Sequence, residues 1–164
     1  MNTERLLQEI QTARTAYSTC LVIYEKPIPD EWEKFVLKQF PNFECIPASK
    51  TSVESFKKAL IEISDRETAC NILARLLHQD LAYDAEIMPL EEAKLFADKL
   101  FSLFSNQTAY FSNSTWNEHE YSQVNNDFKL GLSSWTSFTE ATFDSGIIIC
   151  DIDKIGIAWF ADED

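Results

Sequence analysis

Two apolar runs near the end of the chain, Gly146-Ile147-Ile148-Ile149-Cys150 and Ile155-Gly156-Ile157-Ala158-Trp159-Phe160, decide the fold. Both are continuously apolar, which is typical of strands that are covered on both faces or that form the centre of a sheet under helices. The four residues between them, Asp151-Ile152-Asp153-Lys154, suit a tight hairpin turn. The sequence therefore predicts an antiparallel hairpin at its C-terminus.

Helical patterns fill most of the sequence before residue 105. Apolar residues recur there every three or four positions, and Thr51-Ser52-Val53-Glu54 and Ser64-Asp65-Arg66-Glu67 have the pattern of capping boxes. We expect helices over 4–16, 30–40, 51–63, 64–77 and 90–104, and strands over 20–24, 43–46, 108–113 and 138–143. These elements predict one α+β domain over residues 1–164, with helices packed on a mainly antiparallel sheet.

The composition is that of a folded and strongly acidic chain. Of its 164 residues, 45% are hydrophobic, enough for one core, and the formal net charge is −13. Residues 105–164 carry only Lys129 and Lys154 as basic side chains, and most of the charge imbalance lies there. Such a field repels nucleic acid and anionic membranes and attracts basic partners, although solubility alone also accounts for a net charge.

The sequence carries no sign of export or membrane insertion. No apolar run reaches the roughly 20 residues that span a bilayer, and Met1-Asn2-Thr3-Glu4-Arg5 does not begin a signal peptide. The four cysteines, at positions 20, 45, 70 and 150, lie far apart without a C-x-x-C pair. We expect reduced thiols and a cytoplasmic protein.

Catalytic motifs are absent from the sequence. His78 lies near a predicted helix end, where a structural role is expected, and the adjacent residues Glu118-His119-Glu120 rarely converge on one metal ion. In Gly131-Leu132-Ser133-Ser134-Trp135, a tryptophan replaces the second glycine of a nucleophile elbow. The sequence predicts no nucleophile, metal site or cofactor.

The best case for an enzyme is a magnesium site made of Asp144, Asp151, Asp153 and Lys154. Their spacing resembles the motif of restriction-endonuclease-like enzymes, an aspartate followed at a distance by acid-x-Lys. Ile152 occupies the acidic position of that motif, and a nuclease also needs a basic surface. We therefore expect that the chain is not an enzyme.

Acidic residues lie among aromatic residues in the last third of the chain. Interface hot spots are enriched in Trp and Tyr, and surrounding charges set association rate and specificity. The alternative is that the aromatic residues are core and the acids belong to solvated turns. The candidate partner-binding residues are Trp116, Glu118, Glu120, Tyr121, Trp135, Glu140, Asp144, Asp151, Asp153, Asp162 and Glu163.

In size, charge, lack of a secretion signal and lack of a catalytic motif, the whole chain resembles the acidic immunity proteins with which bacteria neutralise nuclease toxins, including those of contact-dependent growth inhibition. The resemblance implies a protein that binds a basic toxin domain and blocks its active site, with carboxylates in place of phosphates. It implies no direct contact with nucleic acid or membrane. One alternative is a non-enzymatic adaptor or regulatory module that binds another protein. Another is a small hydrolase that uses the polar segment 113–134 as a lid.

Overall fold

The computed structural model describes residues 2–25, 30–39, 52–118 and 130–163, without the side chains of residues 117 and 118. Five strands form one antiparallel sheet in the order β1-β7-β6-β3-β2, and β4 pairs with β5 in a second, two-stranded sheet. The mainly antiparallel α+β fold is as predicted. The elements are α1 (Thr3–Ala13), β1 (Ser18–Tyr24), α2 (Trp32–Leu37), α3 (Val53–Ala59), β2 (Ile61–Ile63), α4 (Arg66–His78), α5 (Leu90–Phe101), β3 (Ala109–Ser112), β4 (Ser114–Glu118), β5 (Leu130–Trp135), β6 (Phe143–Cys150) and β7 (Ile155–Asp162).

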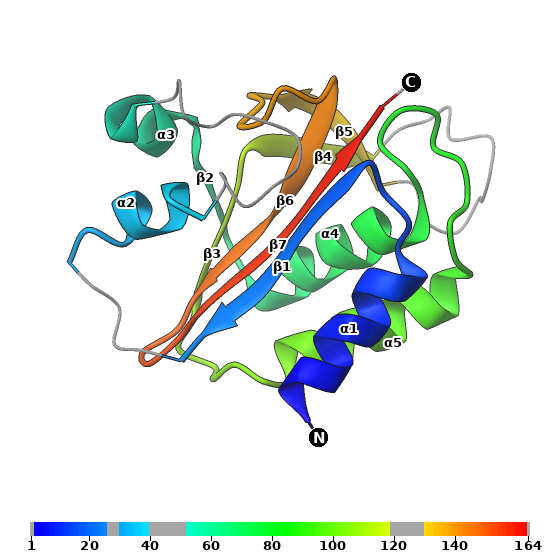
Figure 1. The fold of residues 1–164 in the computed structure, drawn as a ribbon, viewed down its shortest axis with the longest axis horizontal. Helices are drawn as coiled ribbons and strands as arrows, with labels where there is room; N and C mark the ends of the chain where they lie inside the picture. Colours follow the sequence, from blue (N-terminus) through cyan, green and yellow to red (C-terminus); the bar gives the residue numbers. More distant parts are fainter. Residues whose placement is uncertain (1, 26–29, 40–51, 119–129, 164) are drawn as a thin grey trace.

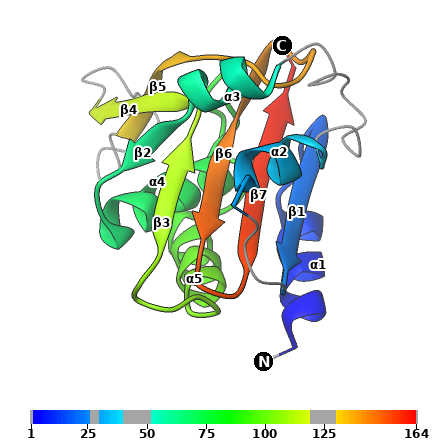
Figure 2. The same ribbon diagram turned by 90° about the vertical axis from the view of Figure 1, so that its left-hand side faces the viewer.

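Helices cover both faces of the large sheet (Figures 1 and 2). The face that carries Ile147, Ile149 and Phe160 packs against α1, α4 and α5 in the larger core. The opposite face, which carries Ile148 and Trp159, packs against α2 and α3 in a second core. The molecule therefore has three layers, with the sheet in the middle.

The predicted C-terminal hairpin is confirmed and occupies the centre of this sheet. β6 pairs with β7 from Phe143 opposite Asp162 to Cys150 opposite Ile155, and the Asp151 N–H donates to the Lys154 carbonyl across the turn. Every residue of β7 is buried. Burial on both faces explains why the two runs are continuously apolar rather than alternating.

Several predicted boundaries differ from the structure. The helix expected to reach residue 63 ends at Ala59, because Leu60 is extended and the alternating Ile61-Glu62-Ile63 pairs with β3 as an edge strand. Helix caps are formed by Ser52 and Asp65, one residue later than the two capping patterns suggested. Three other helices also end before the predicted residue, at positions 13, 37 and 101. The strand predicted at 43–46 lies outside the described residues.

The segments on either side of β5 also differ from the prediction. Residues 138–142 are not a strand but a bend, because the Phe138 and Thr139 N–H groups donate to the carboxylate of Asp144. Of the polar segment 113–134, the described residues 114–118 and 130–134 belong to the paired strands β4 and β5. Trp116 packs from β4 against the larger core.

Within the described segments, no helix is both long and apolar enough to cross a membrane. The described cysteines, Cys20, Cys70 and Cys150, are free thiols, as expected. Burial raises the pKa of each to about 12. They are therefore poor nucleophiles at neutral pH.

Candidate functional site

Two of the predicted partner-binding residues, Asp144 and Asp151, lie at opposite ends of one strand. Asp144 is the second residue of β6, whereas Asp151 follows the last residue of the same strand. At about 3.3 Å per residue, the two aspartates are separated by more than 20 Å along the strand. One magnesium ion therefore cannot join Asp144 to Asp151 and Asp153, because its ligands lie within about 2.1 Å of the metal.

Asp144 is completely buried at the start of β6. Its carboxylate accepts hydrogen bonds from the backbone N–H groups of Phe138 and Thr139, the Thr139 hydroxyl and the Asn113 amide. Burial raises the pKa of Asp144, and the hydrogen bonds from Thr139 and Phe138 oppose the increase. The carboxylate holds the bend before β6 and is not exposed to a partner.

Asp151 has a similar internal role at the opposite end of the hairpin. It accepts hydrogen bonds from the Ser105 N–H at 2.7 Å and from the Ser105 hydroxyl, and so ties the turn to the segment after α5. Burial alone would raise the pKa of Asp151. The bonds from Ser105 and from the Ile152 N–H outweigh that effect and lower the pKa below 3.8.

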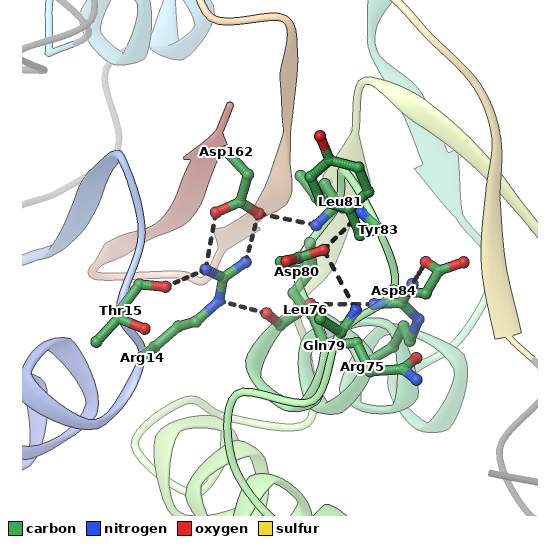
Figure 3. Close-up of polar contacts among 11 residues, drawn as sticks. Arg14, Thr15, Arg75, Leu76, Gln79, Asp80, Leu81, Tyr83, Asp84 and Asp162 are labelled. Atoms are coloured by element: carbon green, nitrogen blue, oxygen red, sulfur yellow. Dashed lines mark hydrogen bonds and ion pairs between the residues drawn. The ribbon is translucent and has the colours of Figure 1, made fainter. Parts of the chain in front are cut away.

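Asp162 forms a buried ion pair with Arg14 (Figure 3). The Asp162 carboxylate accepts from both terminal guanidinium nitrogens, at 2.9 and 2.7 Å, while the Arg14 Nε donates to the Leu76 carbonyl at 2.7 Å. The same carboxylate accepts from the Leu81 N–H at 2.9 Å. A bidentate pair with these further bonds is the geometry in which a buried ion pair is well satisfied. Asp162 thus joins β7, α1 and the segment after α4.

The remaining predicted residues are divided between exposed and partly buried positions. Glu140, Asp153 and Glu163 are exposed, and Glu163 also accepts from the N–H and hydroxyl of Thr142. Trp135 is 37% exposed and its ring lies 5.4 Å from that of Phe143. Trp116 is partly buried; the side chain of Glu118 and all of Glu120 and Tyr121 lie outside the described residues. Whether these residues contact a partner stays a prediction.

The structure directs attention to a segment that sequence analysis missed. Residues 80–92, here named the acidic loop, contain Asp80, Asp84, Glu86, Glu91 and Glu92 and no basic residue. They connect α4 to the first turn of α5. The signal was present in the sequence as a run of acids without a compensating cation, but it was hidden by the larger excess in the last third of the chain.

Hydrogen bonds fix the conformation of the acidic loop. Gln79 and Glu86 form an isolated antiparallel bridge at its base. The Asp80 carboxylate accepts from the Tyr83 N–H at 2.7 Å, a local bond from backbone to side chain, and Asp84 adopts a left-handed φ of 55°. The loop is therefore held in one shape rather than left open.

Arg75, a buried residue of α4, anchors the loop from below (Figure 3). Its guanidinium donates to the Gln79 carbonyl at 3.1 Å, to the Leu130 carbonyl at 2.9 Å and to the Asp84 carboxylate. One arginine thus ties the acidic loop to α4 and β5. Its charge neutralises Asp84. Within the described segments, no buried cation pairs with Glu86, Glu91 or Glu92.

Tyr83 stands at the tip of this fixed loop and is 68% exposed. Glu86, Glu91 and Glu92 are exposed nearby in sequence, and the Glu91 carboxylate lies 3.9 Å from the Lys94 ammonium group at the surface. An exposed aromatic ring on a rigid backbone loses little entropy when it binds, and carboxylates around it favour a cationic partner. The acidic loop is the candidate partner-binding site.

His78, at the end of α4, has the structural role that the sequence predicted. Its ring is fully buried and its Nδ1 lies 2.7 Å from the Met88 carbonyl, which fixes the far end of the acidic loop. Because a carbonyl only accepts, Nδ1 carries the proton. His119 lies outside the described residues. Across the described part of the chain, no three His, Cys, Asp or Glu side chains are grouped to hold a metal ion.

A scan against models of protein families, a search of curated proteins and a search of solved structures found no match to this chain.

Proposed function

We propose that this chain is an acidic inhibitor, of the immunity-protein kind, that binds and blocks a basic protein domain. The observation that supports the proposal most directly is the acidic loop, in which the exposed Tyr83 lies on a fixed backbone between Asp80 and Asp84 in the chain. A nuclease toxin domain is the partner class that fits this surface, because its own substrate is a polyanion. The exposed carboxylates would occupy the positions of substrate phosphates.

Two groups in the acidic loop would contribute to binding in different ways, the aromatic ring of Tyr83 and the neighbouring carboxylates. Charges separated from the partner by more than about 8 Å are screened at physiological salt, so the net charge of the whole chain contributes little to affinity at close range. Tight binding requires a few desolvated contacts at the centre of an interface. Tyr83 supplies the ring for such a contact, and Glu86 supplies a neighbouring exposed charge.

The test is co-expression and pull-down with the basic domain encoded by the neighbouring open reading frame, followed by binding and growth-protection assays. Tyr83→Ala should weaken binding at least tenfold, because truncation of a hot-spot aromatic costs about 2 kcal/mol or more. Leu95→Ala is the matched control, since Leu95 is an exposed apolar residue of α5 outside the acidic loop. It should leave binding and protection unchanged.

Two outcomes would count against the proposal in different ways. If the chain binds its neighbour without protecting any cell, the adaptor alternative replaces the inhibitor. If Tyr83→Ala and Leu95→Ala have equal effects on affinity, the acidic loop is not the contact surface.

A further inference from the structure

Two segments that carry exposed tyrosines meet at one buried carboxylate. Asp162 accepts hydrogen bonds from the Arg14 guanidinium and from the Leu81 N–H (Figure 3). Tyr17 follows Arg14 by three residues, and Tyr83 follows Leu81 by two. Figure 1 shows the connection from α1 to β1 and the loop after α4 at the end of the sheet where the C-terminus lies. The fold therefore brings both tyrosines to one end of the molecule.

The two tyrosines are close enough to belong to one interface. The Arg14 guanidinium also donates to the Thr15 carbonyl, so one guanidinium and one carboxylate bridge the backbone of Thr15 to that of Leu81. Each tyrosine lies two residues further along its segment, and two residues span at most about 7 Å. Even with both segments fully extended, the Cα atoms of the tyrosines lie less than about 30 Å apart. A standard interface covers about 800 Å² of one partner, a patch roughly 30 Å across, so it can contain both.

Both rings are available at the surface. Tyr17 is 60% exposed and Tyr83 is 68% exposed. Tyr17 also lines a hollow of about 410 Å³ between the end of α1 and the beginning of β1. Hydrogen bonds to Asp162 hold the chain two or three residues before each ring. Aromatic side chains on a fixed backbone are the kind of residue that forms interface hot spots.

Charge at this end of the molecule favours a cationic ligand. The acidic loop contains no basic residue. Arg14, the cation nearest to Tyr17 in the chain, is buried and paired with Asp162. Asp80 lies beside the backbone of Tyr83, because its carboxylate accepts from the Tyr83 N–H at 2.7 Å. A ligand that fits both the rings and the charge is therefore a cation that can stack on an aromatic ring.

Arginine is the side chain with these two properties. Its planar guanidinium stacks on a ring and binds carboxylate oxygens through two nitrogens, whereas the ammonium of lysine is a compact and strongly hydrated charge. The chain itself contains such an arrangement. The Arg14 guanidinium lies 5.0 Å from the centre of the Phe160 ring, and two of its nitrogens donate to Asp162. At the surface, Tyr83 and Asp80 supply a ring and a carboxylate from one turn.

We propose that Tyr17 and Tyr83 belong to one contact surface and that each receives an arginine side chain of the basic partner. This inference rests on the proposed function, because the partner is the same. It adds a second anchor to the acidic loop and names the side chain that the partner contributes.

The probe is a hexa-arginine peptide, titrated at physiological salt into the full chain with isotope-labelled tyrosine rings. NMR should show shifts of the Tyr17 and Tyr83 ring signals that saturate with peptide, and no shift for Tyr110, which is buried. A hexalysine peptide carries the same charge. It should bind at least about fivefold more weakly, because an ammonium group stacks less well on a ring.

Variants of the chain locate the contacts. Tyr17→Ala and Tyr83→Ala should each weaken hexa-arginine binding at least about threefold. Tyr17→Phe and Tyr83→Phe keep the ring and should stay within about twofold of the parent chain. Ile152→Ala is the matched control, because Ile152 is 67% exposed and lies at the opposite end of the β6–β7 hairpin from Asp162. It should leave the affinity unchanged.

Two results would overturn the inference. Equal affinities for the two peptides would mean general charge attraction. A Tyr17→Ala variant that binds hexa-arginine as tightly as Ile152→Ala does would remove the second anchor.

The proposed function is tested separately, with the basic domain encoded by the neighbouring open reading frame. If Tyr83→Ala weakens binding of that domain and Tyr17→Ala does not, the two-anchor inference fails while the proposed function stands. If no basic domain binds although hexa-arginine still shifts both rings, the proposed function fails and the arginine-binding surface remains.

Discussion

The acids of the C-terminal hairpin and those of the acidic loop are both abundant in sequence, but the protein uses them differently. Asp144, Asp151 and Asp162 in the hairpin region are buried and accept hydrogen bonds from other segments. In the acidic loop, Glu86, Glu91 and Glu92 are exposed. Density of negative charge along a chain therefore does not show which acids are available to a partner. The hydrogen-bond donors that each acid meets in the fold decide that.

Loss of the Arg14–Asp162 ion pair should have the largest effect on stability. Arg14→Met leaves the carboxylate of Asp162 buried without its cation, which typically costs about 3–5 kcal/mol. Urea unfolding followed by circular dichroism measures the change. Arg5→Met is the control, because the Arg5–Glu9 pair is exposed and should contribute less than about 1 kcal/mol. If the two variants lose the same free energy of unfolding, the buried ion pair contributes no more than the exposed one, and the distinction between buried and exposed acids fails.

Asp144→Asn should rank second. Whichever way the new amide turns, its NH₂ group meets a donor, since the Phe138 and Thr139 N–H groups and the Asn113 amide all point at the carboxylate. We expect a loss of about 2 kcal/mol, the usual effect of leaving buried hydrogen-bonding groups unsatisfied. Glu140→Gln, an exposed change four residues earlier, should stay within about 0.5 kcal/mol of the parent chain in the same unfolding assay. A neutral Asp144→Asn would show that the bend before β6 does not depend on this carboxylate.

The pH dependence of stability should separate Asp151 from Asp144. The pKa of Asp151 is below 3.8 in the folded state, so its stabilising contribution is present above pH 3.8 and is lost as the pH falls through the folded pKa. The pKa of Asp144 is raised instead, so ionisation of this group costs stability as the pH rises through its folded pKa.

Unfolding free energies of the parent chain and of Asp151→Asn, measured between pH 2.5 and 7, test this assignment. Their difference should be largest at neutral pH and should shrink below pH 3.8. A difference that grows towards low pH would contradict the lowered pKa of Asp151.

Glu86→Lys in the acidic loop should have the smallest effect on stability, within about 0.5 kcal/mol, because its side chain is exposed. Its effect should be on binding. Reversal of one charge at the rim of an interface slows association, and the decrease should be several-fold at low salt and vanish at high salt. Stopped-flow or surface-binding kinetics with the basic partner would measure it. An unchanged association rate at low salt would separate Glu86 from the interface and narrow the site to Tyr83.

The sequence predicted only part of the site, because burial of an acid depends on contacts between distant segments. The sequence identified an acidic excess, and the alternation of strand residues predicts that at least one of Trp159 and Phe160 is core. Both are buried, because both faces of β7 are covered. It did not distinguish Asp162 from Glu163, which are neighbours in the chain. Asp162 is buried against Arg14 whereas Glu163 is exposed, and only the position of α1 produces that difference.

The sequence by itself determined the C-terminal hairpin and the apolar stripes of α4 and α5, because these depend on the spacing of residues within one short segment. The tertiary structure alone decided which carboxylates are internal. The donors that satisfy Asp162 come from Leu81 and Arg14, which are 81 and 148 positions away in the chain. Such contacts exist only once the strands and helices have packed, so local composition cannot reveal them. For the same physical reason, the exposed tip of the acidic loop became visible only in the folded arrangement.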